Sequence, residues 1–512
     1  ESRITYARFE FNANSTTTPC IEVNVGSAFL DHLTFANPAS PYIHVDGASF
    51  TISDCYFPAP TTGFELCHGT GGVRSDGHGI FARNFFGKAN NYNDVVDFTG
   101  SQRGTPIVQF INNVVMGGDD DGFDLDGTDA WVEGNIFMHM HRNAGTPDSS
   151  SGVSGGFFKF ATTGEPAGTN NETSQVTIIR NIFFDVDSAC DAKETNFFAM
   201  YNNTIVHQTH VGGVDPIGSV FVVADPNTAE GHGFYFEGNI VSDIEQWTRG
   251  VTNAIITLSN NIIPIAWTGL GGGNSITNPV FKHVPAVSET FFTNWAQAQI
   301  MWDWLSLQMN SPGIGTGPNG TDKGAVNPRG ASISGEPSGT TTQTNVTLHV
   351  GINRTGNGIS PIDWPLGSGY IAYKWRLDGG AWSAETPINT PITLNGLADG
   401  PHYVEASGKN DAGFYQDDPI YGPDAVVTRT PTWNVQASLR FSSTMLSGQT
   451  LNLTFTAVAG NTYTVQYKLN LSDPTWTKLS DVPAQPSTGP FVITEHVAGL
   501  SKFYRIVNPM QP

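Results

Sequence analysis

The sequence predicts an all-β protein: a right-handed parallel β-helix, which is a solenoid, followed by two small β-sandwich domains. Segments with asparagine before two hydrophobic residues recur along residues 1–265, and a separation of 22 residues occurs four times among them. Gly (57) and Pro (31) are frequent and charged residues are few (14%), which favours many short strands and turns over helices. Alternating hydrophobic and polar residues after position 343 predict the sandwiches.

The repeated asparagine marks the predicted coils of the solenoid. In the first three repeats Phe9, Leu33 and Cys55 stand at the equivalent position. Seven later repeats have the asparagine, which is Asn84, Asn113, Asn135, Asn181, Asn203, Asn239 and Asn261. Repeats of this length are typical of solenoids, and about ten coils at ~4.8 Å each are expected. The stacked asparagines are expected to hydrogen-bond as a ladder and to adopt the left-handed conformation of a tight turn.

The predicted domains are residues 1–335, 343–435 and 437–512. Residues 295–305 have helical spacing and several aromatic side chains, which suits a cover for an exposed end of the β-helix core; sugar binding by the tryptophans is the alternative. The formal net charge of -22 argues against nucleic acid as a partner. Since no apolar run reaches the ~18 residues that cross a bilayer, no membrane span is predicted. Four cysteines lack CxxC spacing, which argues against zinc, and any disulfide pairing stays open.

A run of acids stands out at positions 119–126, where five of eight residues are aspartate. Asp124 and Asp126 are two apart, so on a strand both side chains leave the same face, about 7 Å apart. Together with Asp120 and Asp121 they repel one another unless protons or a cation neutralise them. Oxygen ligands in this number suit calcium. An Asp/Gly-rich surface turn without an ion is the alternative.

A column of polar side chains is predicted on one exposed sheet face, with neighbours ~5 Å apart. Its members are Glu22, His44, Glu65, Asp97, Asp124 and Lys159. Three consecutive acids in register are costly without a counter-ion. A lysine beside acids that hold calcium has the parts for β-elimination of a uronate, in which the cation binds the carboxylate and the lysine removes the α-proton. A solvated polar sheet face is the alternative.

Three segments resemble the motif set of polysaccharide lyase family nine, the calcium-dependent pectate lyases built on a β-helix. They are Asn93-Asp94, the turn 120–125 and the segment 156–160, and the resemblance covers residues 90–162. It implies Asp94, Asp120, Asp121 and Asp124 as calcium ligands and Lys159 as the base. Glu65, Asp97 and Asp126 are additional acids predicted to contact the substrate. The first turn lacks the family's glycine, and Phe160 and Ala161 replace a glycine pair after the lysine.

Two further groups of residues are of chemical interest. Lys193 is an alternative base if the separation of 46 residues between Asn135 and Asn181 hides a whole coil. Four positions after the repeated asparagine lie His139, Asp185 and His207, residue types that ligate transition metals. Exposed polar positions on a second sheet face account for the same pattern.

Two classes of function follow. The first is a secreted or cell-surface protein that binds calcium and an acidic polysaccharide or cell-surface glycan, and cleaves it by β-elimination. The second is a non-catalytic extracellular protein, structural, adhesive or fibre-forming, whose rigid solenoid self-assembles or attaches to a larger surface polypeptide. The sequence does not decide whether the protein is an enzyme.

Overall fold

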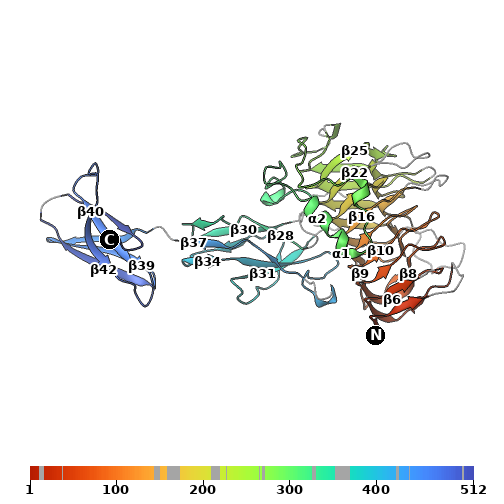
Figure 1. The fold of residues 1–512 in the computed structure, drawn as a ribbon, viewed down its shortest axis with the longest axis horizontal. Coiled ribbons are helices and arrows are strands. Elements are labelled where there is room, and N and C mark those ends of the chain that lie inside the picture. The colour runs from red at the N-terminus through yellow and green to blue at the C-terminus, as the bar shows by residue number, and fades with distance from the viewer. Residues whose placement is uncertain are drawn as a thin grey trace. The chain divides into compact units, whose positions relative to one another are not determined.

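The computed structural model describes residues 1–10, 17–36, 39–142, 150–157, 173–208, 219–225, 228–264, 266–267, 271–325, 330–351, 370–421, 426–436, 439–498 and 501–511 (Figure 1). These residues are all-β, with long parallel sheets and several small antiparallel sheets. They form two compact units. Unit 1 comprises Glu1–Gly335, Leu348–Ile392 and Val404–Thr430, and unit 2 comprises Glu336–Thr347, Thr393–Tyr403 and Pro431–Pro512. The predicted boundaries of three domains stay predictions.

Three parallel sheets, here named A, B and C, make up most of unit 1. Sheet A contains β1 (Ser2–Thr5), β4 (Ser27–Asp31), β6 (Ile43–Ser53), β9 (Gly79–Ala82), β12 (Val108–Ile111), β15 (Ala130–Glu133), β18 (Gln175–Ile179), β21 (Phe197–Tyr201), β24 (Gly233–Glu237) and β27 (Ile255–Ser259). Sheet B contains β2 (Arg8–Glu10), β5 (Thr34–Ala36), β7 (Tyr56–Phe57), β10 (Phe85–Phe86), β13 (Val114–Val115), β16 (Ile136–Met138), β19 (Ile182–Phe184), β22 (Thr204–Gln208) and β25 (Ile240–Ile244).

Sheet C shares β6 with sheet A and carries the candidate site described below. Its other strands are β3 (Ile21–Asn24), β8 (Cys67–Val73), β11 (Val96–Thr99), β14 (Phe123–Asp126), β17 (Ser151–Ser154), β20 (Ser188–Asp191), β23 (Ser219–Val222) and β26 (Gln246–Arg249). From β3 onward the chain visits sheets C, A and B in turn, and strands pair in parallel with their equivalents in the adjoining repeats; β10, β16, β22 and β25 show this stacking in sheet B (Figure 1). Inward-facing side chains from all three sheets form one hydrophobic core cluster.

The predicted asparagine ladder is confirmed. The side chains of Asn113, Asn135 and Asn181 are fully buried, and each amide donates to the amide oxygen of the next at 2.9–3.2 Å. The chain of bonds runs from Asn84 to Asn274. Each ladder oxygen also accepts a hydrogen bond from a backbone N–H; the N–H of Asn113, for example, donates to Asn135 Oδ1. The ladder thereby satisfies buried backbone groups at the same turn of every repeat.

The left-handed conformation predicted for the ladder asparagine is wrong by one residue. The preceding residue adopts it instead, as in Arg83 (φ 56°), Asn112 (φ 55°) and Arg180 (φ 53°), and two repeats place glycine there. The asparagine is thereby free to turn its amide inward, while the left-handed residue before it bends the chain between sheets A and B.

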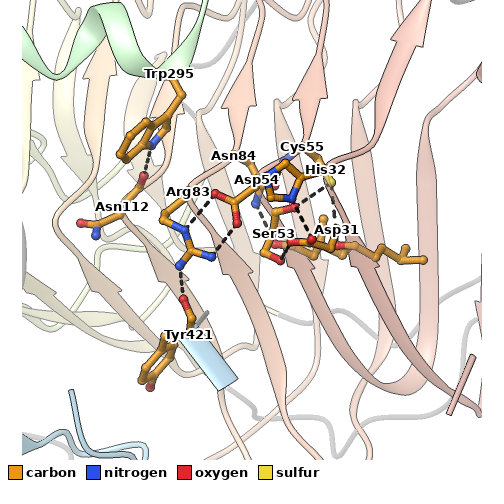
Figure 2. Close-up of polar contacts among 12 residues, drawn as sticks. Asp31, His32, Ser53, Asp54, Cys55, Arg83, Asn84, Asn112, Trp295 and Tyr421 are labelled. Atoms are coloured by element: carbon orange, nitrogen blue, oxygen red, sulfur yellow. Dashed lines mark hydrogen bonds and ion pairs between the residues drawn. The ribbon is translucent and has the colours of Figure 1, made fainter. Parts of the chain in front are cut away.

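The helices cover the outer face of sheet B. These are α1 (Trp295–Ala298) and α2 (Ile300–Trp304), whose buried Ala298 and Met301 pack in one cluster with Ile136, Ile182 and other outward-facing residues of sheet B. The Trp295 indole donates to the carbonyl oxygen of Asn112 at 2.6 Å (Figure 2). The prediction that this segment covers an end of the core is therefore wrong, because the apolar outer residues of sheet B give it a larger surface to cover.

A later part of unit 1 is bonded to side chains of sheet A and its following turn. Figure 2 shows Arg83 between the Asp54 carboxylate and the backbone carbonyl of Tyr421. Asn410 donates to Gln109 at 2.9 Å, and the Tyr370 hydroxyl donates to the buried Glu133. The strands of this part are β28 (Ser332–Ser334), β31 (Ala372–Leu377), β32 (Thr386–Pro387), β35 (Val404–Lys409) and β36 (Thr428–Arg429).

Unit 2 is built from small sheets. One contains β29 (Thr340–Thr341), β34 (Gly400–His402) and β37 (Trp433–Val435). A second sheet contains β38 (Phe441–Ser447), β39 (Thr450–Ala457) and β42 (Gly489–His496). A third contains β40 (Tyr463–Lys468), β41 (Thr477–Val482) and β43 (Phe503–Val507), and these two sheets share one apolar cluster. Strands β30 (Val346–Gly351) and β33 (Ile392–Leu394) contain residues of both units.

Short 3-10 turns occupy Val287–Glu289, Pro318–Gly320 and Pro419–Tyr421. All four cysteines have free thiols. Among the described residues, no helix has the length and apolar character that crossing a bilayer requires.

Candidate metal centre

The polar column on the outer face of sheet C is present from Glu22 to Asp124, with one change of member in that part. Glu22 lies opposite His44, and Asp97 lies opposite Asp124, as predicted. His68, not Glu65, occupies the place between His44 and Asp97, because the strand begins at Cys67, three residues later than predicted. The consecutive acids in register are therefore Asp97 and Asp124, with two histidines before them.

Three aspartates converge at the turns that lead into β11 and β14. One carboxylate oxygen from each of Asp94, Asp120 and Asp121 lies within 4.8 Å of the others. The backbone N–H of Asp121 donates to Asp94 Oδ1 at 3.0 Å, and Ser151 donates to Asp121 Oδ1 through its N–H (2.7 Å) and its hydroxyl (2.8 Å). These bonds hold two of the three carboxylates in place, and the parallel register sets one turn directly beside the other.

The pKa values of this group show that its charges are poorly compensated. Burial and the nearby Asp124, Asp120, Asp121 and Asp97 carboxylates raise the pKa of Asp94 well above its usual range. Burial raises the pKa of Asp121 to about 7, although Lys193 and hydrogen bonds from serines oppose that shift. A second positive charge at this place would lower the pKa of both carboxyl groups.

Asp124, the fourth predicted ligand, lies beside this group of three. Among the neighbouring acids it contributes most to the raised pKa of Asp94. Its Oδ1 atom is buried and receives no hydrogen bond from the residues that the structure describes. Carboxylate oxygens alone, one of them without a donor, are the ligand set that calcium prefers, so these residues fit a calcium ion.

Lys193 is a lysine whose charge acts on Asp121 and Asp124. It follows β20, and its ammonium lies 3.6 Å from both Asp191 Oδ2 and Asp225 Oδ2, whose side chains are fully buried. The acids around it, Asp191 first and Asp121, Asp124 and Asp225 after it, hold its pKa well above the usual range despite burial. Burial and the carboxylates of Asp225 and Asp121 raise the pKa of Asp191 well above its usual range, although Lys193 opposes this shift.

Lys159, the predicted base, falls in residues 158–172, outside the described part of the chain. On the side away from β11, β14 pairs with β17, which takes the place predicted for a strand at residues 158–161; those residues are outside the described part as well. Asn135 and Asn181 are joined directly in the ladder across the separation of 46 residues, and the described strands between them are β16, β17 and β18. The charge of Lys193 acts on Asp121 and Asp124 across β17, which contains only serine, glycine and valine.

The three acids predicted to contact a substrate lie along the same face. His68 links two of them, with Nδ1 3.1 Å from Glu65 Oε2 and Nε2 3.4 Å from Asp97 Oδ2. Asp126 lies two residues beyond Asp124, opposite Thr99 on one side and Gly156 on the other. Sequence reasoning missed Asp191 and Asp225, since the serines of β17 interrupt the run of acids that would have pointed to them.

Comparison with known proteins identifies no family. No family model matches the chain, and no curated protein matches it. The solved structures that match include one of carbohydrate-binding modules from the β-sandwich superfamily, reported for their promiscuous specificity, with 12% identity over 35% of this chain and 95% of that chain and a TM-score of 0.16.

Proposed function

We propose that this chain is an extracellular or cell-surface protein that binds calcium and an acidic polysaccharide on the outer face of sheet C, and cleaves the polysaccharide by β-elimination. The observation that carries the proposal is the convergence of Asp94, Asp120 and Asp121 within 4.8 Å, beside the orphaned oxygen of Asp124. The fold we infer is a right-handed parallel β-helix with β-sandwich modules after it. The repeating order of sheets C, A and B and the right-handedness of connections between parallel strands support this inference.

Asp94, Asp120 and Asp121 would hold the cation, with Asp124 as a fourth ligand. Calcium takes about six to eight oxygen ligands, so a uronate carboxylate and water complete the set. A bound calcium ion would withdraw electrons from the uronate carboxylate and acidify the adjacent C–H bond. The acidic chain needs this bridge, because its net charge of -22 opposes a polyanion.

Two lysines of the chain are proposed to take the remaining roles, one in substrate binding and one in proton abstraction. Lys193 carries a proton held by Asp191 and Asp225, so its ammonium is suited to binding a substrate carboxylate or the oxygen that leaves. Lys159, which the family resemblance implies as the base, is the residue we propose for proton abstraction. Asp97 with His68 and Glu65 lies on the same face and offers acceptors for sugar hydroxyls.

The test is the ultraviolet absorbance of unsaturated uronate, followed on pectate, alginate and glycosaminoglycans with calcium and with chelator. The native protein is expected to release unsaturated product from one polymer with calcium only. Lys159→Ala and Lys193→Ala are expected to lose that activity, while Lys282→Ala, whose exposed ammonium pairs with Asp303, keeps it. Absence of product from every polymer with calcium present would overturn the catalytic part of the proposal.

A non-catalytic extracellular protein, structural, adhesive or fibre-forming, is the second candidate. The raised pKa of Lys193 favours it, because a lysine held protonated by buried acids neutralises them and is a poor base. In that case calcium raises the temperature of unfolding and the polymer binds without being cleaved. Sedimentation with calcium, at increasing protein concentration, would show the self-assembly that a fibre-forming protein requires.

A further inference from the structure

A second group of ligand-type side chains lies at the turns after sheet B, near the aspartate site: the backbone N–H of His141 donates to the carbonyl oxygen of Gly118 at 3.0 Å, two residues before Asp120. His139 Nδ1 lies 2.8 Å from Asp185 Oδ2, and His141 Nε2 lies 3.1 Å from the same oxygen. His207 Nε2 lies 4.0 Å from the other oxygen, Asp185 Oδ1. Three imidazole nitrogens therefore surround one carboxylate, and none of these residues belongs to the aspartate site on sheet C.

The second nitrogen of each ring is held by a hydrogen-bond acceptor. His139 Nε2 lies 3.3 Å from the backbone carbonyl of Thr290, and His141 Nδ1 lies 2.8 Å from Asp187 Oδ1. His207 Nδ1 lies 2.7 Å from Asp243 Oδ2. A metal-bound histidine almost always donates its other N–H to a carbonyl or a carboxylate, which fixes the ring and its tautomer. All three rings meet this condition, each with a different acceptor.

The repeat places these residues together. His139 directly follows β16, Asp185 directly follows β19, and His207 lies in β22, so three successive repeats contribute at equivalent positions. All three adopt the left-handed conformation, with φ of 56°, 56° and 58°. That conformation belongs to the turn, since the equivalent Asp243 of the next repeat shares it (φ 55°), and it gives these side chains the same direction in each repeat.

The group is enclosed on one side and open on the other. The side chains of His139 and Asp185 are 7% and 6% exposed, whereas that of His207 is 32% exposed. The Phe291 ring stacks on His139 with ring centroids 4.4 Å apart. An ion can therefore enter beside His207 and lie against walls that restrict water.

A comparison within the same chain shows what distinguishes this group. Asp31, His32 and Asp54 also bring ligand atoms within 4.8 Å, but Arg83 donates to both Asp54 oxygens, at 2.9 and 2.6 Å (Figure 2). A guanidinium thus already neutralises that carboxylate, and the His32 side chain is 42% exposed. Three histidines, His139, His141 and His207, face the Asp185 carboxylate instead.

We propose that His139, His141, His207 and Asp185 bind a divalent transition-metal ion of the zinc class. Three imidazole nitrogens and one carboxylate oxygen are a ligand set for zinc, cobalt, nickel or copper, and a poor one for calcium or magnesium. In a tetrahedral zinc site neighbouring ligand atoms lie roughly 3.3 Å apart, as bonds of ~2.0 Å require. Ligand atoms of His139, His141 and Asp185 lie within 4.8 Å of one another, and His207 Nε2 lies 4.0 Å from the other Asp185 oxygen, so small side-chain movements would bring the four to such a geometry.

The experiment is titration of the full chain, first stripped with a chelator, with Co²⁺ followed by Zn²⁺. We expect the visible bands of four-coordinate cobalt at one equivalent, their loss when zinc replaces cobalt, and no effect of excess calcium. His141→Gln is expected to lower zinc affinity by at least ~100-fold, more than the ~10- to 100-fold typical of a lost supporting partner. Asp187→Asn keeps every ligand and is expected to lower affinity by ~10- to 100-fold.

His32→Gln is the matched control and is expected to leave the cobalt bands and the zinc affinity unchanged. Circular dichroism of each stripped variant establishes that it folds, and the Asp187→Asn variant decides the matter if His141→Gln does not fold. Absence of cobalt bands in the native chain, their survival in folded His141→Gln, or their loss in His32→Gln would each overturn the proposal.

Discussion

Removal of the charge at position 121 is expected to stabilise the calcium-free protein above neutral pH. The Asp121 carboxyl group is 3% exposed, lies beside Asp94 and Asp120, and has a pKa of about 7. Asparagine keeps the oxygen that accepts both hydrogen bonds from Ser151, and it carries no charge. The Asp121→Asn variant therefore loses the repulsion among the carboxylates and retains the local hydrogen bonds.

The size of the effect follows from the pKa. Its rise from the model-peptide value of 3.8 to about 7 is close to three pH units. At ~1.4 kcal/mol per unit, ionising Asp121 costs on the order of 4 kcal/mol of unfolding free energy, part of which relaxation recovers. A group whose pKa is higher in the folded state stabilises most below its unfolded pKa. The unfolding free energy of the native chain should thus fall as the pH rises from about 4 to about 7. Asp121→Asn should lack the part of this decrease that comes from ionising Asp121.

The assay is urea unfolding followed by tryptophan fluorescence, with chelator, at about pH 5 and about pH 8. Asp119→Asn is the control, since that carboxylate pairs with the Lys88 ammonium at 2.6 Å and its loss is expected to destabilise. The native chain should lose stability between the two pH values, and Asp121→Asn should exceed it at about pH 8. A pH dependence shared equally by the native chain and Asp121→Asn, or equal destabilisation by both variants, would refute the reasoning.

Three further substitutions test other parts of the fold. Asn135→Leu should lower the unfolding free energy by ~1–3 kcal/mol for each polar group left unsatisfied along the ladder, and a loss under ~0.5 kcal/mol in urea unfolding would contradict it. Lys193→Met should lower the unfolding free energy by ~3–5 kcal/mol at about pH 8, because Asp191 and Asp225 lose their cation. Adding Asp191→Asn should restore part of that stability, and a double variant no more stable than Lys193→Met would contradict the ion pair between Lys193 and Asp191. Met301→Ala should lower the unfolding free energy by ~2–5 kcal/mol, because Met301 packs against sheet B. Met309 is 93% exposed, so Met309→Ala should change it by no more than ~0.5 kcal/mol. Equal urea unfolding midpoints for the two variants would contradict the packing of α2 on sheet B.

The repeat predicts the parallel pairing better than it predicts where a strand begins. The recurring asparagine identifies the turn between sheets A and B, because a buried amide ladder requires the same residue in each repeat. In contrast, the alternation Phe64, Leu66 resembles a strand although β8 begins at Cys67. Phe64 and Leu66 are both buried, but they lie in the turn before β8 and not in the strand. Alternating hydrophobic residues therefore indicate which side chains point into the core, but they do not determine which residue of the neighbouring strand lies opposite.

The candidate site was predictable in part for the same reason. Asp94 and the pair Asp120 and Asp121 are found together because equivalent turns of successive repeats stack, which the repeat implies. Lys193 and Asp191 join them across β17, whose small residues carry no signal of a site. The histidine group was visible as a spacing of residue types, but His141 lies outside that spacing and only the structure brings it to Asp185.

Calcium binding to the aspartate site tests the central claim most directly. Isothermal titration of chelator-stripped protein with calcium is predicted to give one site in the native chain and in Asp119→Asn. That site is predicted to be lost in Asp94→Asn. Retention of binding in Asp94→Asn, or no calcium binding by the native chain, would contradict the account.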